Sequence, residues 1–162
     1  MERYKQEIHG QLLDGPSELT DPERNLLRLA REAMDRAYAP YSGFRVGAAL
    51  RMADGAIVTG NNQENAAFPS GLCAERIAFF AAGSAYPGVA ITDLAIVASS
   101  ENFSVEHPVA PCGACRQVML EYELNQDLAI RMIFSGDKGR IIRLEGAHHL
   151  LPLFFHEVSL RR

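Results

Sequence analysis

The sequence predicts a single α/β domain with a three-layer α/β/α architecture, in which a mixed five-stranded sheet lies between helices. Three observations predict it. The chain has 162 residues, helix-like and strand-like segments alternate along it, and no stretch has the composition of an interdomain linker. We expect an N-terminal extension, or partial helix, over residues 1–18 and the single domain over residues 19–162.

The first elements of this domain have clear local signals. Thr20-Asp21-Pro22-Glu23 has the form of a capping box with proline in the first turn, and apolar residues follow it at helical spacing. This pattern predicts a helix over about 21–38. Residues 44–52 and 56–60 flank Asp54-Gly55, a tight-turn dipeptide, and therefore predict an antiparallel hairpin.

The later elements are predicted from apolar runs and their boundaries. Residues 73–82 are apolar nearly all round, which is typical of a buried helix, and Gly83 is expected to end it. Crossover helices are expected to make the strands that they connect parallel neighbours. The remaining predictions are a buried strand at 94–98, a loop at 99–110, a helix at 112–123 and strands at 128–134 and 140–144.

Composition and charge indicate the class of partner. The chain is 48% apolar and 22% charged, as soluble globular proteins are, and its net charge is −4 with neutral histidines. No run of Lys or Arg is longer than Arg161-Arg162, so a small molecule is favoured over a nucleic-acid polymer. The first residues lack the apolar run of a signal peptide, and no stretch approaches the ~18 apolar residues of a membrane span. We therefore expect a cytoplasmic protein with no membrane partner.

The three cysteines form the pattern that indicates chemistry. Cys73 opens one predicted helix, and Cys112 and Cys115 open another. A helix N-terminus favours the thiolate, which is the metal-binding form of cysteine. The spacing of three places Cys112 and Cys115 on one side of a helical turn, and Gly113 between them leaves room for a metal.

Three sulfur ligands suit Zn²⁺, and a catalytic zinc site leaves its fourth position to water. We therefore predict one catalytic zinc ion. Two alternatives remain open: a closed structural site with His107 as the fourth ligand, and a redox pair formed by Cys112 and Cys115.

Glu75 lies two residues after Cys73, at the start of an apolar helix. A buried carboxylate is costly unless it is paired or has a chemical task, so Glu75 is the predicted proton-transferring residue. The alternative is a salt bridge with Arg76 or Arg116. Three thiolates around Zn²⁺ leave a net charge of −1, which opposes ionisation of a bound water. We predict that at least one of these arginines donates a hydrogen bond to a ligand sulfur.

Cys73-Ala74-Glu75 and Pro111-Cys112-Gly113-Ala114-Cys115 together resemble the signature of zinc-dependent cytidine deaminases in its all-cysteine form. The resemblance extends from Tyr38 to about Phe155. It implies the cytidine deaminase-like fold, one zinc ion per subunit, and a small homotetrameric enzyme of pyrimidine salvage. The implied reaction is hydrolytic deamination of cytidine and 2′-deoxycytidine to uridine and 2′-deoxyuridine, with Glu75 as the catalytic residue.

The same resemblance implies how the nucleoside is held. Asn62 and Glu64, in the segment Asn62-Gln63-Glu64-Asn65-Ala66, would bind the sugar 3′-hydroxyl, and the backbone amide of Ala74 would orient the pyrimidine carbonyl. Phe155, with Phe154 as its alternative, would reach a neighbouring subunit and stack on the base. The implied substrate contacts are Phe44, Asn62, Glu64, Ala66, Phe68, Ala74 and Phe155.

Three features depart from the family pattern: Phe68 stands where many members have a tyrosine, the stretch 99–109 is longer, and so is the N-terminal extension. Other functions remain as alternatives. These are a deaminase of another aminopyrimidine nucleoside such as blasticidin S, a polynucleotide-editing enzyme, and a zinc-stabilised binding module without activity. Editing enzymes are expected to have a basic surface, which the sequence does not show.

Overall fold

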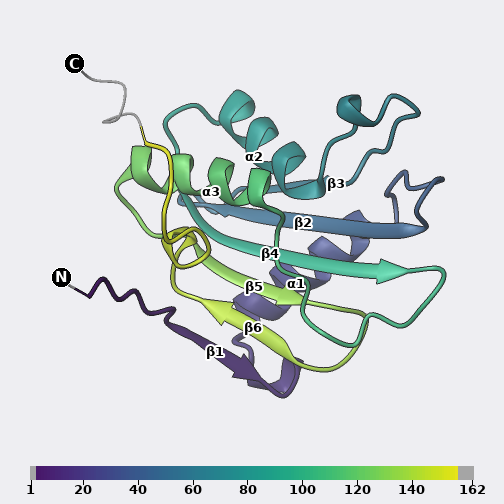
Figure 1. Ribbon diagram of the computed structural model, residues 1–162, viewed down its shortest axis with the longest axis horizontal. Helices are drawn as coiled ribbons and strands as arrows, with labels where there is room; N and C mark the ends of the chain where they lie inside the picture. The colour runs from purple at the N-terminus through teal and green to yellow at the C-terminus, as the bar shows by residue number, and fades with distance from the viewer. Residues whose placement is uncertain (1–2, 157–162) are drawn as a thin grey trace.

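The computed structural model describes residues 3–156 and has the predicted three-layer architecture. The helix α1 covers one face of a six-stranded sheet, and α2 and α3 lie together on the other face (Figure 1). The elements are β1 (Gly10–Leu13), α1 (Asp21–Met34), β2 (Phe44–Met52), β3 (Ile57–Asn61), α2 (Ala74–Ala85), β4 (Ile91–Ser100), α3 (Gly113–Gln126), β5 (Arg131–Ser135) and β6 (Ile141–Leu144), with short 3₁₀ helices at Pro16–Glu18, Phe68–Ser70 and Ala147–His149.

The strand order is β1-β6-β5-β4-β2-β3, and the sheet is mixed as predicted. Its only parallel pairing among the described residues is β4 with β5, the two strands that α3 connects. The prediction was wrong for α2, because the strands that it connects, β3 and β4, are not neighbours. β2 lies between them and pairs antiparallel with each. The chain therefore crosses over one strand when it passes through α2.

The predicted count of five strands was wrong, because residues 10–13 add a sixth. Gly10–Leu13 pairs antiparallel with β6, from Gly10 opposite Leu144 to Leu13 opposite Ile141. A strand of four residues has too little periodicity to be recognised locally, and its partner lies far along the chain. The division of the chain at residue 18 stays a prediction, and the end of the predicted domain, residues 157–162, lies outside the described residues.

The start of α1 agrees with the predicted capping box. The backbone N–H and the hydroxyl of Thr20 each donate to the Glu23 carboxylate at 2.8 Å. The helix ends at Met34 and not at residue 38. It packs closely on β2, since a Cβ added to Gly47 would lie 2.0 Å from the carbonyl oxygen of Ala30.

The helix α2 continues past Gly83, which was expected to end it. A Cβ at position 83 would lie 2.4 Å from the hydroxyl of Tyr122 on α3, so this glycine allows close contact between the two helices. At its other end, α2 rests on β3. A Cβ at Gly60 would lie 2.4 Å from the carbonyl oxygen of Ala74. The start of α2 is thus fixed against the sheet by close backbone contact.

The core on the α2–α3 face contains large side chains that are fully buried, among them Phe79, Met119 and Phe134. This packing fixes the two helices side by side, and both begin after a loop. Within residues 3–156, no helix is both long and apolar enough to cross a bilayer.

Candidate active site

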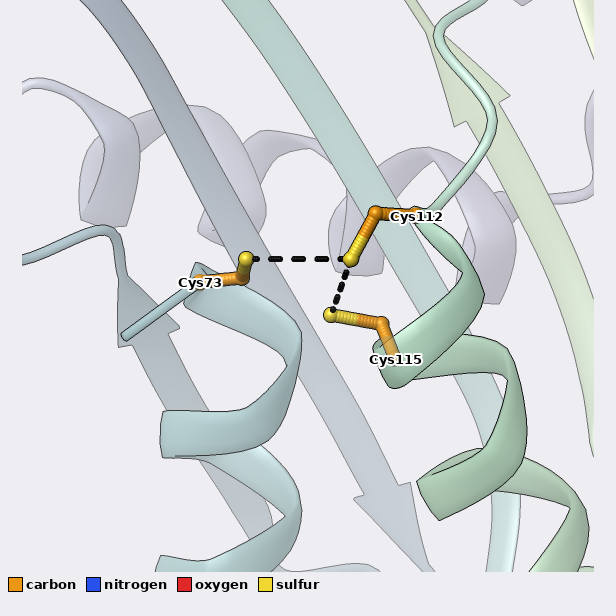
Figure 2. A group of neighbouring side chains, drawn as sticks. All are labelled: Cys73, Cys112 and Cys115. Atoms are coloured by element: carbon orange, nitrogen blue, oxygen red, sulfur yellow. Dashed lines mark hydrogen bonds between the residues drawn. The ribbon is translucent and has the colours of Figure 1, made fainter. Parts of the chain in front are cut away.

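The three cysteines meet at the starts of α2 and α3, with their sulfurs turned toward one another (Figure 2). Cys73 is the N-cap of α2, Cys112 is the N-cap of α3, and Cys115 lies in the first turn of α3. The Sγ atoms of Cys73 and Cys112 are 4.0 Å apart, and those of Cys112 and Cys115 are 3.5 Å apart. Tetrahedral zinc with bonds of about 2.3 Å places its sulfurs about 3.8 Å apart. The donor set and its spacing therefore fit zinc.

Within the described part of the chain, the group has no fourth protein ligand. Among residues 3–156, the potential ligand atoms within 4.8 Å of one another come from Cys73, Cys112 and Cys115 alone. His107 is not among them, so the closed site with His107 is wrong for this structure. The presence of Cys73 beside the other two thiols favours a metal site over a redox pair, and all three cysteines are free.

The thiols differ in acidity. A hydrogen bond from the Cys115 thiol, with help from Arg76 and Cys112, lowers the pKa of Cys73 to about 5, although burial opposes the shift. The hydrogen bond to Cys73, together with burial, raises the pKa of Cys115. Without metal, the cluster therefore still carries thiol protons. Zinc binding displaces such protons, because its ligands are thiolates.

The two arginines next to the site contact different groups. The Nη2 atom of Arg76 donates to Cys73 Sγ at 3.8 Å, while its Nε is buried and has no hydrogen-bond partner in the described part of the chain. Arg116 donates from Nε to the carbonyl oxygen of Pro111 at 2.7 Å and from Nη1 to that of Leu150 at 3.1 Å. The positive charge beside a ligand sulfur thus comes from Arg76. Its effect on a bound metal stays a prediction.

Glu75 is buried in the first turn of α2, with 5% of its surface exposed. Burial, and next the negative charge of Cys73, raises the pKa of its carboxyl group, while its own backbone N–H and the Cys115 thiol oppose that shift. Arg76 and Arg116 direct their guanidinium groups to Cys73 and to backbone carbonyls, so the ion pair considered as an alternative for Glu75 is not formed.

A hollow of about 530 Å³ opens beside Cys73, within the size range of small-molecule sites. It brings together Asn62, Glu64 and Phe68 of the predicted substrate contacts with Cys73 and Arg76 of the predicted metal site. The lining residues are Tyr41, Ser42, Asn62, Gln63, Glu64, Asn65, Phe68, Gly71, Leu72, Cys73 and Arg76.

Glu64 is held by the loop before β2. Its carboxylate accepts hydrogen bonds from the N–H groups of Tyr41 and Ser42, at 2.9 and 3.3 Å, and from the Ser42 hydroxyl at 2.5 Å. The Ser42 hydroxyl is the main reason why the pKa of Glu64 is lowered. Sequence reasoning missed Ser42, whose only local signal is its place before the turn at Gly43, where φ is +62°.

Asn62 is bound to the backbone of β2. Its Oδ1 accepts from the N–H of Val46 at 2.8 Å, and its Nδ2 donates to the carbonyl oxygen of Phe44 at 2.9 Å. The amide oxygen is therefore occupied within the protein, and the second hydrogen of Nδ2 is the group left for a ligand.

The aromatic side chains of the predicted site lie in different surroundings. Phe44 is half-buried and stacks on Phe103 of the long loop, with ring centroids 6.3 Å apart. Phe68 is 76% exposed and meets Tyr41 edge-on. Phe155 is 61% exposed and does not line the hollow of its own chain.

The two alanines among the predicted substrate contacts also differ in burial. Ala66 is exposed, whereas Ala74 is fully buried.

Comparisons with known proteins agree with this geometry. Residues 20–129 match the family model described as the cytidine and deoxycytidylate deaminase zinc-binding region. The chain belongs to this family. The match contains all three cysteines and Glu75, and zinc is the cofactor that the cysteine group fits.

Relatives and solved structures extend the match over most of the chain. A cytidine deaminase of Mycobacterium tuberculosis (strain H37Rv) is 41% identical over 123 residues, which are 74% of this chain and 88% of the relative. One of Sporosarcina psychrophila is 49% identical over 98 residues, 60% of this chain and 67% of the relative. The crystal structure of the cytidine deaminase of Burkholderia pseudomallei covers 85% of this chain and 100% of its own, with a TM-score of 0.68 and 38% identity. The fold is therefore the cytidine deaminase fold.

Proposed function

We propose that this protein is a zinc-dependent cytidine deaminase, which hydrolyses cytidine and 2′-deoxycytidine to uridine and 2′-deoxyuridine with release of ammonia. The observation that carries the proposal is the open group of three sulfurs with buried Glu75 beside it, next to a hollow that contains Glu64. We further propose that it acts in the cytoplasm, in pyrimidine salvage, with residues 19–162 as the catalytic domain and residues 1–18 as an extension.

Glu75 carries the protons of the reaction. When bound, a zinc ion supplies a nucleophilic water at neutral pH. Glu75 accepts one proton from this water and transfers it to ring nitrogen N3 as C4 is attacked. It then accepts the proton that remains on the attacking oxygen and delivers it to the amino group, which leaves as ammonia while the C4 carbonyl forms. A buried carboxylate whose pKa is raised suits this alternation between base and acid. Arg76 offsets part of the negative charge of the sulfurs through Cys73.

The hollow holds the sugar. Glu64 accepts a hydrogen bond from the sugar 3′-hydroxyl, with carboxylate lone pairs that Tyr41 and Ser42 leave free. The second Nδ2 hydrogen of Asn62 donates a hydrogen bond to the oxygen of the same hydroxyl. Ala66 and Phe68 line the sugar side, Phe44 packs against the nucleoside, and the amide of Ala74 orients the pyrimidine carbonyl.

Phe155 stacks on the base of a neighbouring subunit in a homotetramer, with one zinc ion per subunit. Its 61% exposure supports a role outside its own chain. A small-molecule nucleoside is the substrate and no nucleic-acid polymer is bound.

The test is to incubate the purified, zinc-loaded protein with cytidine, 2′-deoxycytidine and blasticidin S and to follow the loss of cytosine absorbance. We expect turnover of both nucleosides, and loss of turnover in the Glu75→Gln variant with its zinc content unchanged. Activity on blasticidin S alone would overturn the substrate assignment. Full zinc occupancy without turnover of any of the three would favour the binding module.

A further inference from the structure

We propose that Arg116 and Gln117, the two residues that follow Cys115 on α3, are positioning residues. They hold the C-terminal segment, residues 150–155, against the zinc-binding loop, which is the chain at Pro111 and Cys112. The proposal rests on the proposed function, because it takes Phe155 of this segment as the side chain that stacks on the base. It assigns the two residues a task in substrate binding that is separate from metal binding.

Arg116 connects the two parts directly. Its Nε donates to the carbonyl oxygen of Pro111 at 2.7 Å, and its Nη1 donates to the carbonyl oxygen of Leu150 at 3.1 Å. Pro111 immediately precedes Cys112, and Leu150 begins the C-terminal segment. A guanidinium group is planar and rigid, so two bonds from one group fix the direction of both acceptors. The zinc-binding loop and the segment are therefore held in one arrangement.

Gln117 holds the far end of the same segment. Its Nε2 donates to the carbonyl oxygen of Phe155 at 3.0 Å. Leu150 is buried, but Leu153, Phe154 and Phe155 are 77%, 41% and 61% exposed. Between described residues, no backbone–backbone hydrogen bond involves residues 151–155. The two side chains of α3 thus supply hydrogen bonds at both ends of a segment that lacks a backbone ladder of its own.

Arg76 gives the matched contrast. Arg76 follows Glu75 near the start of α2, and Arg116 follows Cys115 near the start of α3. Both helices carry predicted zinc ligands at their starts. Yet Arg76 donates to a sulfur, whereas Arg116 donates to two carbonyls. Substitution of Arg76 should therefore change metal binding and catalytic rate, and substitution of Arg116 or Gln117 should change the segment and the affinity for substrate.

The test uses the absence of tryptophan from the sequence. In a Leu153→Trp parent, whose only tryptophan lies on the segment, we compare Arg116→Lys, Gln117→Met and, as the matched control, Arg76→Lys. The measurements are zinc content, kcat and KM for cytidine, and the fluorescence anisotropy of the tryptophan.

We expect Arg116→Lys to raise KM about tenfold and Gln117→Met about threefold, because one hydrogen bond to the segment is lost in each. In both variants kcat stays within about twofold, zinc content is unchanged and anisotropy falls. Arg76→Lys should lower kcat or zinc content while the anisotropy stays the same.

Two results would overturn the proposal: unchanged KM and anisotropy in both α3 variants, or a joint loss of zinc and kcat, which would make Arg116 and Gln117 supports of the metal loop. A parent that binds zinc but does not turn over cytidine would instead overturn the proposed function. Anisotropy alone would then decide whether the two side chains hold the segment.

Discussion

Two helices on the same face of the sheet each bury a glutamate, and the surroundings of the two carboxylates differ. Glu123 of α3 is 6% exposed, and its carboxylate accepts from the backbone N–H groups of Ile130, Ala147 and His148 at 2.7–3.2 Å and contacts the His148 ring at 2.7 Å. Glu75 of α2 is 5% exposed and lies beside the sulfurs, where burial raises its pKa.

The difference separates a structural carboxylate from one that is free for chemistry. Glu123 has four donors within the fold, which matches what an ionised carboxylate can accept, so its charge is stabilised where it lies. It joins the chain after α3 to the turn at Ala147–His149. Among residues 3–156, Glu75 has no comparable set of backbone donors from other elements, so lone pairs of its carboxylate remain available to a ligand. Burial alone therefore does not distinguish the two roles, and the partners do.

The largest expected effect comes from substituting each glutamate with glutamine. Glu75→Gln should lower kcat by about 10²–10⁴-fold, the range for loss of a general acid–base group, with little change in stability. Glu123→Gln should leave kcat near that of the parent, and it should lower the free energy of unfolding by about 1–3 kcal/mol, because an amide NH₂ faces backbone N–H donors. Steady-state kinetics and urea unfolding measure the two quantities.

Glu121→Gln is the matched control on α3, since Glu121 is only half-buried and contacts Asn125. It should change neither quantity. A loss of stability in Glu75→Gln as large as that in Glu123→Gln would contradict the distinction drawn between the two buried carboxylates.

The next largest effect concerns how tightly the starts of α2 and α3 are packed. Gly60→Ala should cost about 1–3 kcal/mol of stability, because the new methyl group would overlap the backbone of α2 at Ala74 and Ala78. Gly113→Ala, at the start of α3, meets no atom within 4 Å and should be neutral or stabilising by up to about 1 kcal/mol. Thermal unfolding of the two variants measures the contrast, and equal destabilisation would show that both starts are equally constrained.

The smallest expected effect concerns Glu23, a carboxylate in the first turn of α1. Burial would raise its pKa, but hydrogen bonds from Thr20 and Arg143 lower it below the ordinary value of 4.5. A carboxyl whose pKa is lowered by folding stabilises the fold above its unfolded pKa, and that contribution is lost as the pH falls through the folded value. Glu23→Gln should therefore cost less than about 1 kcal/mol at pH 7, and this cost should shrink as the pH falls below 4.5.

Urea unfolding at several pH values measures this dependence. A cost that grows toward acid pH would contradict the assignment of Glu23 as a structural, ionised carboxylate.

Features with short-range causes could be predicted from the sequence. The capping box at Thr20, the hairpin at Asp54-Gly55 and the two helix starts that carry the cysteines each depend on neighbouring residues. Glu75 could be singled out because a carboxylate at the start of an apolar helix conflicts with its surroundings.

Features with partners far along the chain could not be predicted. Gly83 was expected to end a helix. Its actual role, which is to allow close packing of α2 against Tyr122 of α3, depends on a contact that the local sequence does not show. Glu123 was missed because its donors at Ile130, Ala147 and His148 come together only in the folded chain. The sequence could not tell which of Arg76 and Arg116 donates to a sulfur, because the acceptor of Arg116 at Leu150 lies 34 positions away.

The N-terminal strand has a consequence for how copies of this protein can associate. An edge strand exposes a row of N–H and C=O groups that another chain can use as a template. Gly10–Leu13 covers that row along β6, and the edge strand that it forms is four residues long. Short edges are poor templates, so continuous sheets that extend from one copy to the next are disfavoured on this side.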